Sequence, residues 1–265
     1  RRREVGRLEP APGTVPTGRL PSFLEEAVTQ ELDQPVFVAR EKELARLDDY
    51  LNRALKGQGQ VIFITGEAGG GKTALLGEFS RIAQEAHEEL VVAGGNCNAH
   101  TGIGDPYLPF REILELLTGD VESRWKAGAI SRDHALRLWR TLPLTGQALV
   151  ENGVGLIDTF LPGAALVERA AAAMPGGAEW LTRLCGLLDL ETRSAIVQGP
   201  RQDLLFEQLT KVLQALARQV PLVLLVDDLQ WADLGSISLL FHLGRQLSGS
   251  HILIAGAYRP EEVSL

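Results

Sequence analysis

Residues 66–73 decide the fold of this chain, and their sequence is Gly66-Glu67-Ala68-Gly69-Gly70-Gly71-Lys72-Thr73. The stretch fits the pattern G-x-x-x-x-G-K-[ST] at every fixed position. Glycines let consecutive backbone N–H groups curl around a chain of phosphates, because a Cβ would block both the close approach and the backbone angles. An apolar run precedes the stretch and a helical period follows it, which is the context that a phosphate-binding loop requires. We therefore predict that this loop binds the phosphates of a nucleotide.

The lysine and the threonine have separate roles in this prediction. A helix that starts near Lys72 points the positive end of its dipole at the phosphates. Lys72 reaches the β- and γ-phosphates as a catalytic candidate, and the Thr73 hydroxyl ligates Mg²⁺. The predicted nucleotide contacts in the loop are Gly66, Glu67, Ala68, Gly69, Gly70, Gly71, Lys72, Thr73 and Ala74.

Strand and helix patterns alternate on both sides of the loop. Short apolar runs rich in β-branched residues predict strands at 61–65, 90–93, 221–226 and 252–256, the first of them buried on both faces. Helical periods separate or flank them at 41–55, 73–86, 203–218 and 236–247. Asp233 is the expected N-cap of the last helix. This alternation predicts an α/β fold, namely the three-layer αβα sandwich of a P-loop NTPase with a mainly parallel sheet.

The rest of the chain divides into a linker and an insertion. Five prolines before residue 36 interrupt any helix, so residues 1–34 are predicted to form a Pro-rich linker. Its one apolar patch, 20–24, either docks on the domain or belongs to whatever precedes it. The P-loop domain is assigned to 35–265. Within it, about 97–201 shows helical periods without a clear strand, which predicts a helical insertion.

Composition narrows the range of partners and the cellular compartment. The net charge of −8 disfavours non-specific binding to nucleic acid or to an anionic membrane. Cys97 and Cys185 are far apart and form no disulfide framework, which favours a reducing cytoplasm. The longest apolar run, 220–226, is too short to span a bilayer. We expect a cytoplasmic protein with no membrane segment and no direct nucleic-acid contact here.

Two acidic residues, Asp227 and Asp228, directly follow the third predicted strand. A carboxylate at the end of a strand beside the phosphate loop holds Mg²⁺ through its water shell, and Asp227 is the predicted metal residue. Asp228 is the candidate that orients or deprotonates the attacking water. The alternative is that Asp228 only caps a turn. Aspartate is also shorter than the glutamate often used as the base, which leaves fast hydrolysis open.

Arg259 directly follows the fourth predicted strand. If that strand lies between the strand before the phosphate loop and the strand that ends at Asp227, its carboxyl end faces the γ-phosphate. Arg259 then senses or neutralises charge there, as a third catalytic candidate. The alternative is an ordinary surface arginine before Pro260.

Two further segments carry a resemblance to a known family. Val36-Phe37-Val38-Ala39-Arg40-Glu41 resembles the φ-V-G-R-E motif of the signal-transduction (STAND) ATPases, which are relatives of AAA+ proteins. Asp227-Asp228-Leu229-Gln230-Trp231-Ala232-Asp233 resembles the D-D-L-[HQ]-W-A-D motif of their large bacterial branch. That branch supplies the ATPase module of large LuxR-type and SARP-type transcriptional regulators and is also fused to nucleotide cyclases and kinases. The resemblance covers about 35–260.

The resemblance implies a site for ATP or ADP with Mg²⁺. It places Val38 and Arg40 near the adenine and ribose, Asp227 and Asp228 at the metal and water, and Arg259 as a sensor. Ala39 departs from the family pattern, which usually has glycine at this position. Family members continue into a small helical domain and a winged-helix domain that help to close over the nucleotide, and we expect both to be absent from residues 1–265.

The leading functional hypothesis is a regulatory ATPase switch. It binds Mg-ATP, hydrolyses it slowly to ADP and phosphate, and alters sensor and output domains of the same full-length protein, with a nucleotide-dependent oligomer as a further possibility. A second hypothesis is a small-molecule kinase that uses the insertion as a lid over its acceptor. A third is a nucleotide-dependent scaffold that binds ATP without turning it over.

Overall fold

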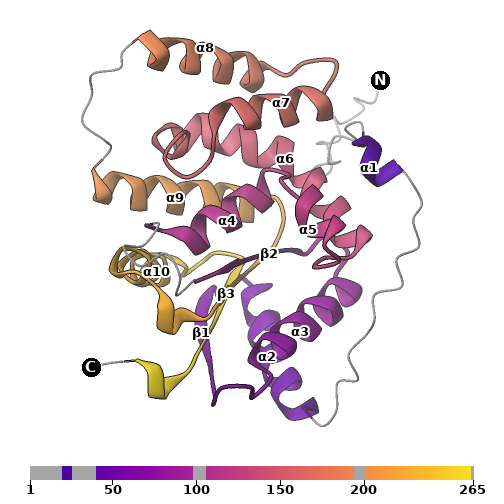
Figure 1. Cartoon of the computed structure of the whole chain (residues 1–265), viewed down its shortest axis with the longest axis vertical. Helices are drawn as coiled ribbons and strands as arrows, with labels where there is room; N and C mark the ends of the chain where they lie inside the picture. Colours follow the sequence, from indigo (N-terminus) through magenta and orange to yellow (C-terminus); the bar gives the residue numbers. More distant parts are fainter. Residues whose placement is uncertain (1–19, 26–39, 98–105, 194–200, 264–265) are drawn as a thin grey trace, which may run out of the picture.

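A four-stranded parallel sheet forms the centre of the structure (Figure 1). The computed structural model describes residues 20–25, 40–97, 106–193 and 201–263. The strands are β1 (Gln60–Thr65), β2 (Val91–Asn96), β3 (Leu222–Asp227) and β4 (Ile252–Tyr258). Their order is β1-β4-β3-β2. The last strand therefore lies between the strand before the phosphate loop and the strand that ends at Asp227, as the hypothesis for Arg259 requires.

Helices cover both faces of this sheet. The helices that pack against it include α2 (Glu41–Ala54), α3 (Lys72–Ala86), α4 (Leu108–Leu117), α9 (Gln202–Ala217) and α10 (Leu234–Gln246), and α6 (Arg132–Asn152) also contacts β2. Side chains alternate along β3: Val223 packs with α2 and α3, whereas Leu222 and Leu224 belong to the core shared with α4, α9 and α10. Buried apolar residues on both faces explain the continuous apolar pattern of this strand. The predicted α/β architecture is confirmed.

The first strand differs from its prediction. Among the described strands, β1 pairs only with β4, so it is an edge strand. Phe63, at its middle, is 51% exposed. The prediction that 61–65 is buried on both faces is therefore wrong. The residue types of a buried strand are present, but the neighbours that would bury it on both faces are not found among the described residues.

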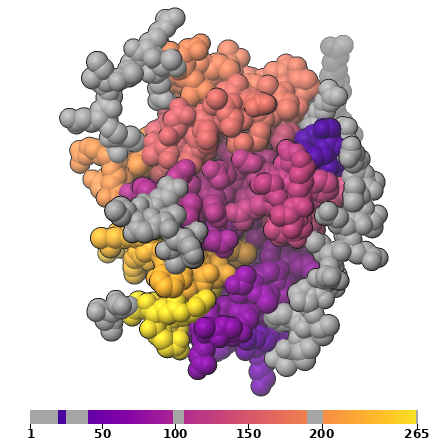
Figure 2. Space-filling view, in the orientation of Figure 1, coloured from indigo at the N-terminus to yellow at the C-terminus, as the bar shows by residue number. Residues whose placement is uncertain are grey.

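The segment predicted as a helical insertion contains helices wherever the structure describes regular elements in it. Its described elements are α4, α5 (Glu122–Lys126), α6 (Arg132–Asn152), the short η2 (Val154–Leu156), α7 (Gly163–Ala173) and α8 (Glu179–Arg193). Helix α6 continues past Pro143 to Asn152, and Leu149 and its neighbours extend its buried face beyond the proline. Figure 1 shows α6, α7 and α8 above the sheet, and Figure 2 shows the same part of the chain forming the upper part of the molecule.

Helix α6 attaches the insertion to the part of the fold that holds the phosphate loop. The Arg137 guanidinium donates hydrogen bonds to the carbonyl oxygens of Gln84 and His87, at 2.6 and 2.8 Å. Both carbonyls lie at the C-terminal end of α3, where helix carbonyls lack partners within the helix. His134 contacts the Val92 carbonyl oxygen of β2 through Nε2 at 2.8 Å.

The patch at 20–24 docks on the domain, which is one of the two alternatives left open for it. It overlaps the single-turn helix α1 (Ser22–Glu25), and Leu24 is fully buried in the main core. The Arg132 guanidinium donates two hydrogen bonds to the Leu24 carbonyl oxygen, at 2.7 and 3.1 Å. Residues 1–19 and 26–34, which were also predicted as linker, lie outside the described part of the chain. None of the described helices combines the length and apolar character needed to cross a membrane.

Candidate nucleotide-binding site

The phosphate loop connects the end of β1 to the start of α3. Gly69 and Gly71 have φ angles of +69° and +73°, in the left-handed region that side chains with a Cβ rarely adopt. The Gly70 amide donates a hydrogen bond to the Glu67 carbonyl oxygen at 3.1 Å, which closes the turn. The loop therefore depends on glycine at Gly71, which the pattern fixes, and at Gly69, where the pattern allows any residue.

Lys72 and Thr73 lie at the N-terminal end of α3, where the prediction placed them. The Lys72 side chain is 7% exposed, and its Nζ donates to the carbonyl oxygens of Gly66 and Glu67 at 2.8 and 2.9 Å. The Thr73 hydroxyl donates to Asp227 Oδ2 at 2.5 Å. This contact joins the phosphate loop to the acidic end of β3 across 154 positions of sequence.

The two acids have different environments. Asp227 is the last residue of β3 and only 7% exposed, and its Oδ1 accepts a hydrogen bond from the Asp228 amide at 2.8 Å. Asp228 has a φ of +54°, an unusual backbone conformation for a residue other than glycine. It precedes the short η3 helix (Leu229–Trp231) but makes no capping hydrogen bond with its side chain. Its Oδ1 instead accepts from Gln230 Nε2 at 2.7 Å.

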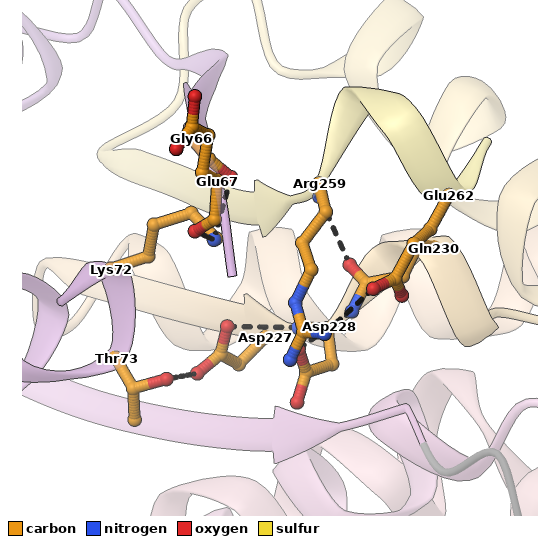
Figure 3. Close-up of polar contacts among 9 residues, drawn as sticks. All are labelled: Gly66, Glu67, Lys72, Thr73, Asp227, Asp228, Gln230, Arg259 and Glu262. Carbon is orange, nitrogen blue, oxygen red and sulfur yellow. Dashed lines mark hydrogen bonds and ion pairs between the residues drawn. The ribbon is translucent and has the colours of Figure 1, made fainter. Parts of the chain in front are cut away.

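Arg259 extends from the end of β4 toward these carboxylates (Figure 3). Its Nη1 donates to Glu262 Oε1 at 2.7 Å, and its Nη2 lies 3.8 Å from Asp228 Oδ1. The hydrogen bond with Glu262, together with the charges of Glu262, Asp228 and Asp227, raises the pKa of Arg259. Its backbone amide donates to Gln230 Oε1 at 3.2 Å. The guanidinium is thus held among carboxylates at the carboxyl ends of the strands, where the phosphate loop also lies.

Arg40, one of the predicted nucleotide contacts, makes a direct contact with the phosphate loop. Its Nη2 donates a hydrogen bond to the Gly70 carbonyl oxygen. The structure therefore places this side chain against the loop backbone, and its contact with the base or ribose stays a prediction. Val38 lies outside the described residues. Ala74 occupies the first turn of α3 as an exposed residue.

Gln230 and Glu262 belong to the same contact network, although neither was predicted as a site residue. Gln230 donates to Asp228 and accepts from the Arg259 amide, which only a side chain with both a donor and an acceptor can do. Glu262 follows Arg259 at the i+3 position, and this spacing was the only signal in the sequence for the ion pair.

Several acidic side chains lie near the carboxyl ends of the strands. Burial is the main cause that raises the pKa of the Cys97 thiol to about 12, and the charges of Asp233, Asp228, Asp227 and Glu112 raise it further. No group of three or more His, Cys, Asp or Glu side chains that could hold a metal occurs in the described part of the chain. The Thr73 hydroxyl and the Asp227 carboxylate are nevertheless the hard oxygen ligands that Mg²⁺ prefers, and Mg²⁺ usually takes its other ligands from water and phosphate. The residues present fit that ion when a nucleotide accompanies it.

Comparison with known proteins agrees with this geometry. The family model described as "AAA ATPase domain" matches residues 36–255. An uncharacterized protein of Rhizobium meliloti (strain 1021) is 25% identical over 227 residues, which are 86% of this chain. The chain spans only about a fifth of that relative, since the matched part is 19% of its length. No solved structure matches the chain.

Proposed function

The chain belongs to the AAA ATPase domain family, and from this premise we propose that it binds Mg-ATP at the phosphate loop and hydrolyses it slowly, as a regulatory switch. The observation that carries this proposal is the 2.5 Å contact between the Thr73 hydroxyl and the Asp227 carboxylate. These are the two groups expected to hold Mg²⁺, and they come from segments far apart in the chain. Their meeting beside the buried Lys72 favours a triphosphate site over a glycine-rich turn with another purpose.

The residues of the site have complementary charges for this reaction. Lys72 is proposed to leave the carbonyl oxygens of the loop and bind the β- and γ-phosphates, which are stronger acceptors. Asp228 is proposed to orient the attacking water, because its strained backbone and the hydrogen bond from Gln230 fix its carboxylate. Arg259 is proposed to stabilise negative charge on the γ-phosphate. Mg²⁺ supplies charge neutralisation at the phosphates, and Thr73 and Asp227 are the residues that would hold it.

The regulatory part of the proposal concerns what surrounds this domain. ATP and ADP differ in the γ-phosphate, so only a contact sensitive to that group makes the domain a switch. We propose that sensor and output domains of the same full-length protein respond to it, with transcription as one such output and an oligomer of the ATP form as one such response. The free thiols of Cys97 and Cys185 support a cytoplasmic site of action.

A second candidate function, a scaffold that binds ATP without hydrolysing it, is favoured by one observation. Asp228 Oδ1 already accepts a hydrogen bond from Gln230 and lies 3.8 Å from the Arg259 guanidinium. Both interactions involve the oxygen atom that would otherwise accept a hydrogen bond from the attacking water. If Asp228 keeps these partners when ATP is bound, the water has no base and turnover does not occur.

Phosphate release under single-turnover conditions separates the two functions. Hydrolysis predicts slow, Mg²⁺-dependent release by the wild type and a loss of about 100-fold or more in Asp228→Asn, since a positioned base contributes roughly 10²–10⁴-fold. Asp49→Asn, at an exposed position of α2, is the matched control and should keep the wild-type rate. ATP binding without release would establish the scaffold. Wild-type release by Asp228→Asn would refute the role of this carboxylate.

A further inference from the structure

We propose that Glu262 is a positioning residue that holds the Arg259 guanidinium away from the γ-phosphate, so that recruiting Arg259 to ATP requires breaking the Arg259–Glu262 ion pair. The inference rests on the proposed function, because it assumes that ATP occupies the site beside Asp228. It goes beyond that function by naming the residue that opposes the ATP state and the segment that responds.

The contacts of Arg259 show which partner holds it. The guanidinium donates to Glu262 at 2.7 Å, whereas its nearest distance to Asp228 is 3.8 Å, too long for a hydrogen bond. Glu262 is therefore the stronger partner. In the view of Figure 3, Arg259 lies between Lys72 and Thr73 on one side and Gln230 and Glu262 on the other. Rotation of its side chain toward the phosphate loop would take it away from Glu262.

The Arg259 backbone is fixed while its side chain changes partner. The Arg259 amide donates to Gln230 Oε1 at 3.2 Å, and Gln230 is in turn bonded to Asp228. Strand β4 ends at the preceding residue, Tyr258. A γ-phosphate therefore competes with Glu262 only for the guanidinium, and no shift of the strand is needed.

Glu262 loses its described partner when Arg259 leaves. Its second oxygen, Oε2, is buried and accepts no hydrogen bond from the described residues. Both side chains are about 30% exposed, at 29% and 30%, so neither is fully solvated where it lies. A carboxylate with one oxygen buried and no cation is unfavourable. We infer that the short η4 helix (Pro260–Glu262) then moves so that Glu262 reaches water.

This arrangement links the γ-phosphate to the chain that follows the sheet. ATP, but not ADP, would draw Arg259 from Glu262 and loosen η4. The coupling is reciprocal. If ATP weakens the binding of a partner that holds η4 in place by some factor, that partner lowers the affinity for ATP by the same factor. In this proposal, η4 is the segment that changes when the γ-phosphate is present, and Glu262 couples it to Arg259.

The first test compares ATP and ADP affinities of the wild type and Glu262→Gln by competition calorimetry with Mg²⁺. Partly exposed ion pairs are weak, so the variant should bind ATP about twofold to fivefold more tightly while its ADP affinity stays unchanged. Glu261→Gln is the matched control, because Glu261 is the exposed neighbour with the same charge and should change neither affinity. In an Arg259→Gln background, Glu262→Gln should have no effect, since it acts through Arg259.

Equal effects on ATP and ADP, or the same effect in Glu261→Gln, would overturn the proposal in favour of general electrostatics. A second measurement needs no variant: hydrogen exchange at the Glu262 and Val263 amides, which bond within η4 at 3.2 and 3.3 Å, should be faster with a non-hydrolysable ATP analogue than with ADP. Equal exchange would overturn the proposal. Failure of folded wild type to bind either nucleotide would refute the proposed function itself, and this inference with it.

Discussion

Replacing Arg137 by methionine should destabilise the protein by about 2–4 kcal/mol, because this side chain joins the insertion to the phosphate-loop helix. Its Nη2 and Nη1 donate to the carbonyl oxygens of Gln84 and His87 at 2.6 and 2.8 Å. These carbonyls end α3, where the helix dipole is negative and a cation is favourable. The same helix carries Lys72 and Thr73 at its other end.

The magnitude follows from these contacts. A hydrogen bond to a charged group contributes about 1.5–3 kcal/mol, and a cation at a helix C-terminus adds about 0.3–1 kcal/mol. The two bonds do not add fully, because water can replace part of the bond to the half-buried His87 carbonyl and methionine keeps the packing of the aliphatic stem. The expected range of about 2–4 kcal/mol reflects one full bond, part of a second and the dipole.

Urea unfolding followed by circular dichroism measures this effect. Arg137→Met should lower the free energy of unfolding with an unchanged slope, which shows that the native state and not the unfolded chain is affected. Arg140→Met is the control, since Arg140 is an exposed arginine of the same helix and its loss should cost less than about 0.5 kcal/mol. Equal stabilities of the two variants would refute the reasoning.

Three other predictions concern the loop, a partly buried histidine and the thiols. In the urea assay, Gly71→Ala should lower the free energy of unfolding by about 1–2 kcal/mol because Gly71 has a φ of +73°. Gly77→Ala should instead raise it by about 0.5–1 kcal/mol, because Gly77 lies inside α3 with open space around it. Burial lowers the pKa of His134 below its ordinary value of 6.5, so the unfolded state takes up the proton first and stability should fall as the pH drops below about 6.5. Unfolding at several pH values should show a smaller loss in His134→Gln, and the exposed His251→Gln should behave as wild type. Cys97, whose pKa is raised to about 12, should react with a thiol reagent at pH 8 far more slowly than the less buried Cys185, so Cys185→Ser should remove the fast phase and Cys97→Ser should retain it.

The central fold was predictable because its signals are local. The glycine loop, the apolar strand runs and the helical periods each lie within about fifteen residues, and their alternation admits few topologies. The N-cap role of Asp233 is confirmed, since its side chain accepts from the Ser236 amide at 2.9 Å. Even the meeting of Thr73 and Asp227 follows from two parallel strands that end at the same edge.

The parts that were not predicted depend on contacts between distant segments. The exposure of side chains on β1 depends on which strands lie beside it. The residue types of 61–65 do not reveal those neighbours. The role of Gln230 requires the turn after β3 to meet the end of β4, which lies 29 positions further along the chain. The contact of Arg40 with Gly70 spans 30 positions. Sequence patterns identified the ends of these elements but not the side chains that bridge them.

Calorimetric titration of Mg-ATP into the wild type, Lys72→Ala and Lys56→Ala tests the central claim most directly. Lys56 is an exposed lysine in the turn after α2, so its variant controls for the loss of one positive charge. We predict that the wild type and Lys56→Ala bind ATP alike and that GTP binds more weakly. Lys72→Ala, which removes the ammonium group beside Gly66 and Glu67, should bind no ATP while its circular dichroism spectrum remains that of the wild type. Equal binding by Lys72→Ala, or no binding by folded wild type, would contradict the assignment of residues 66–73 as the phosphate site.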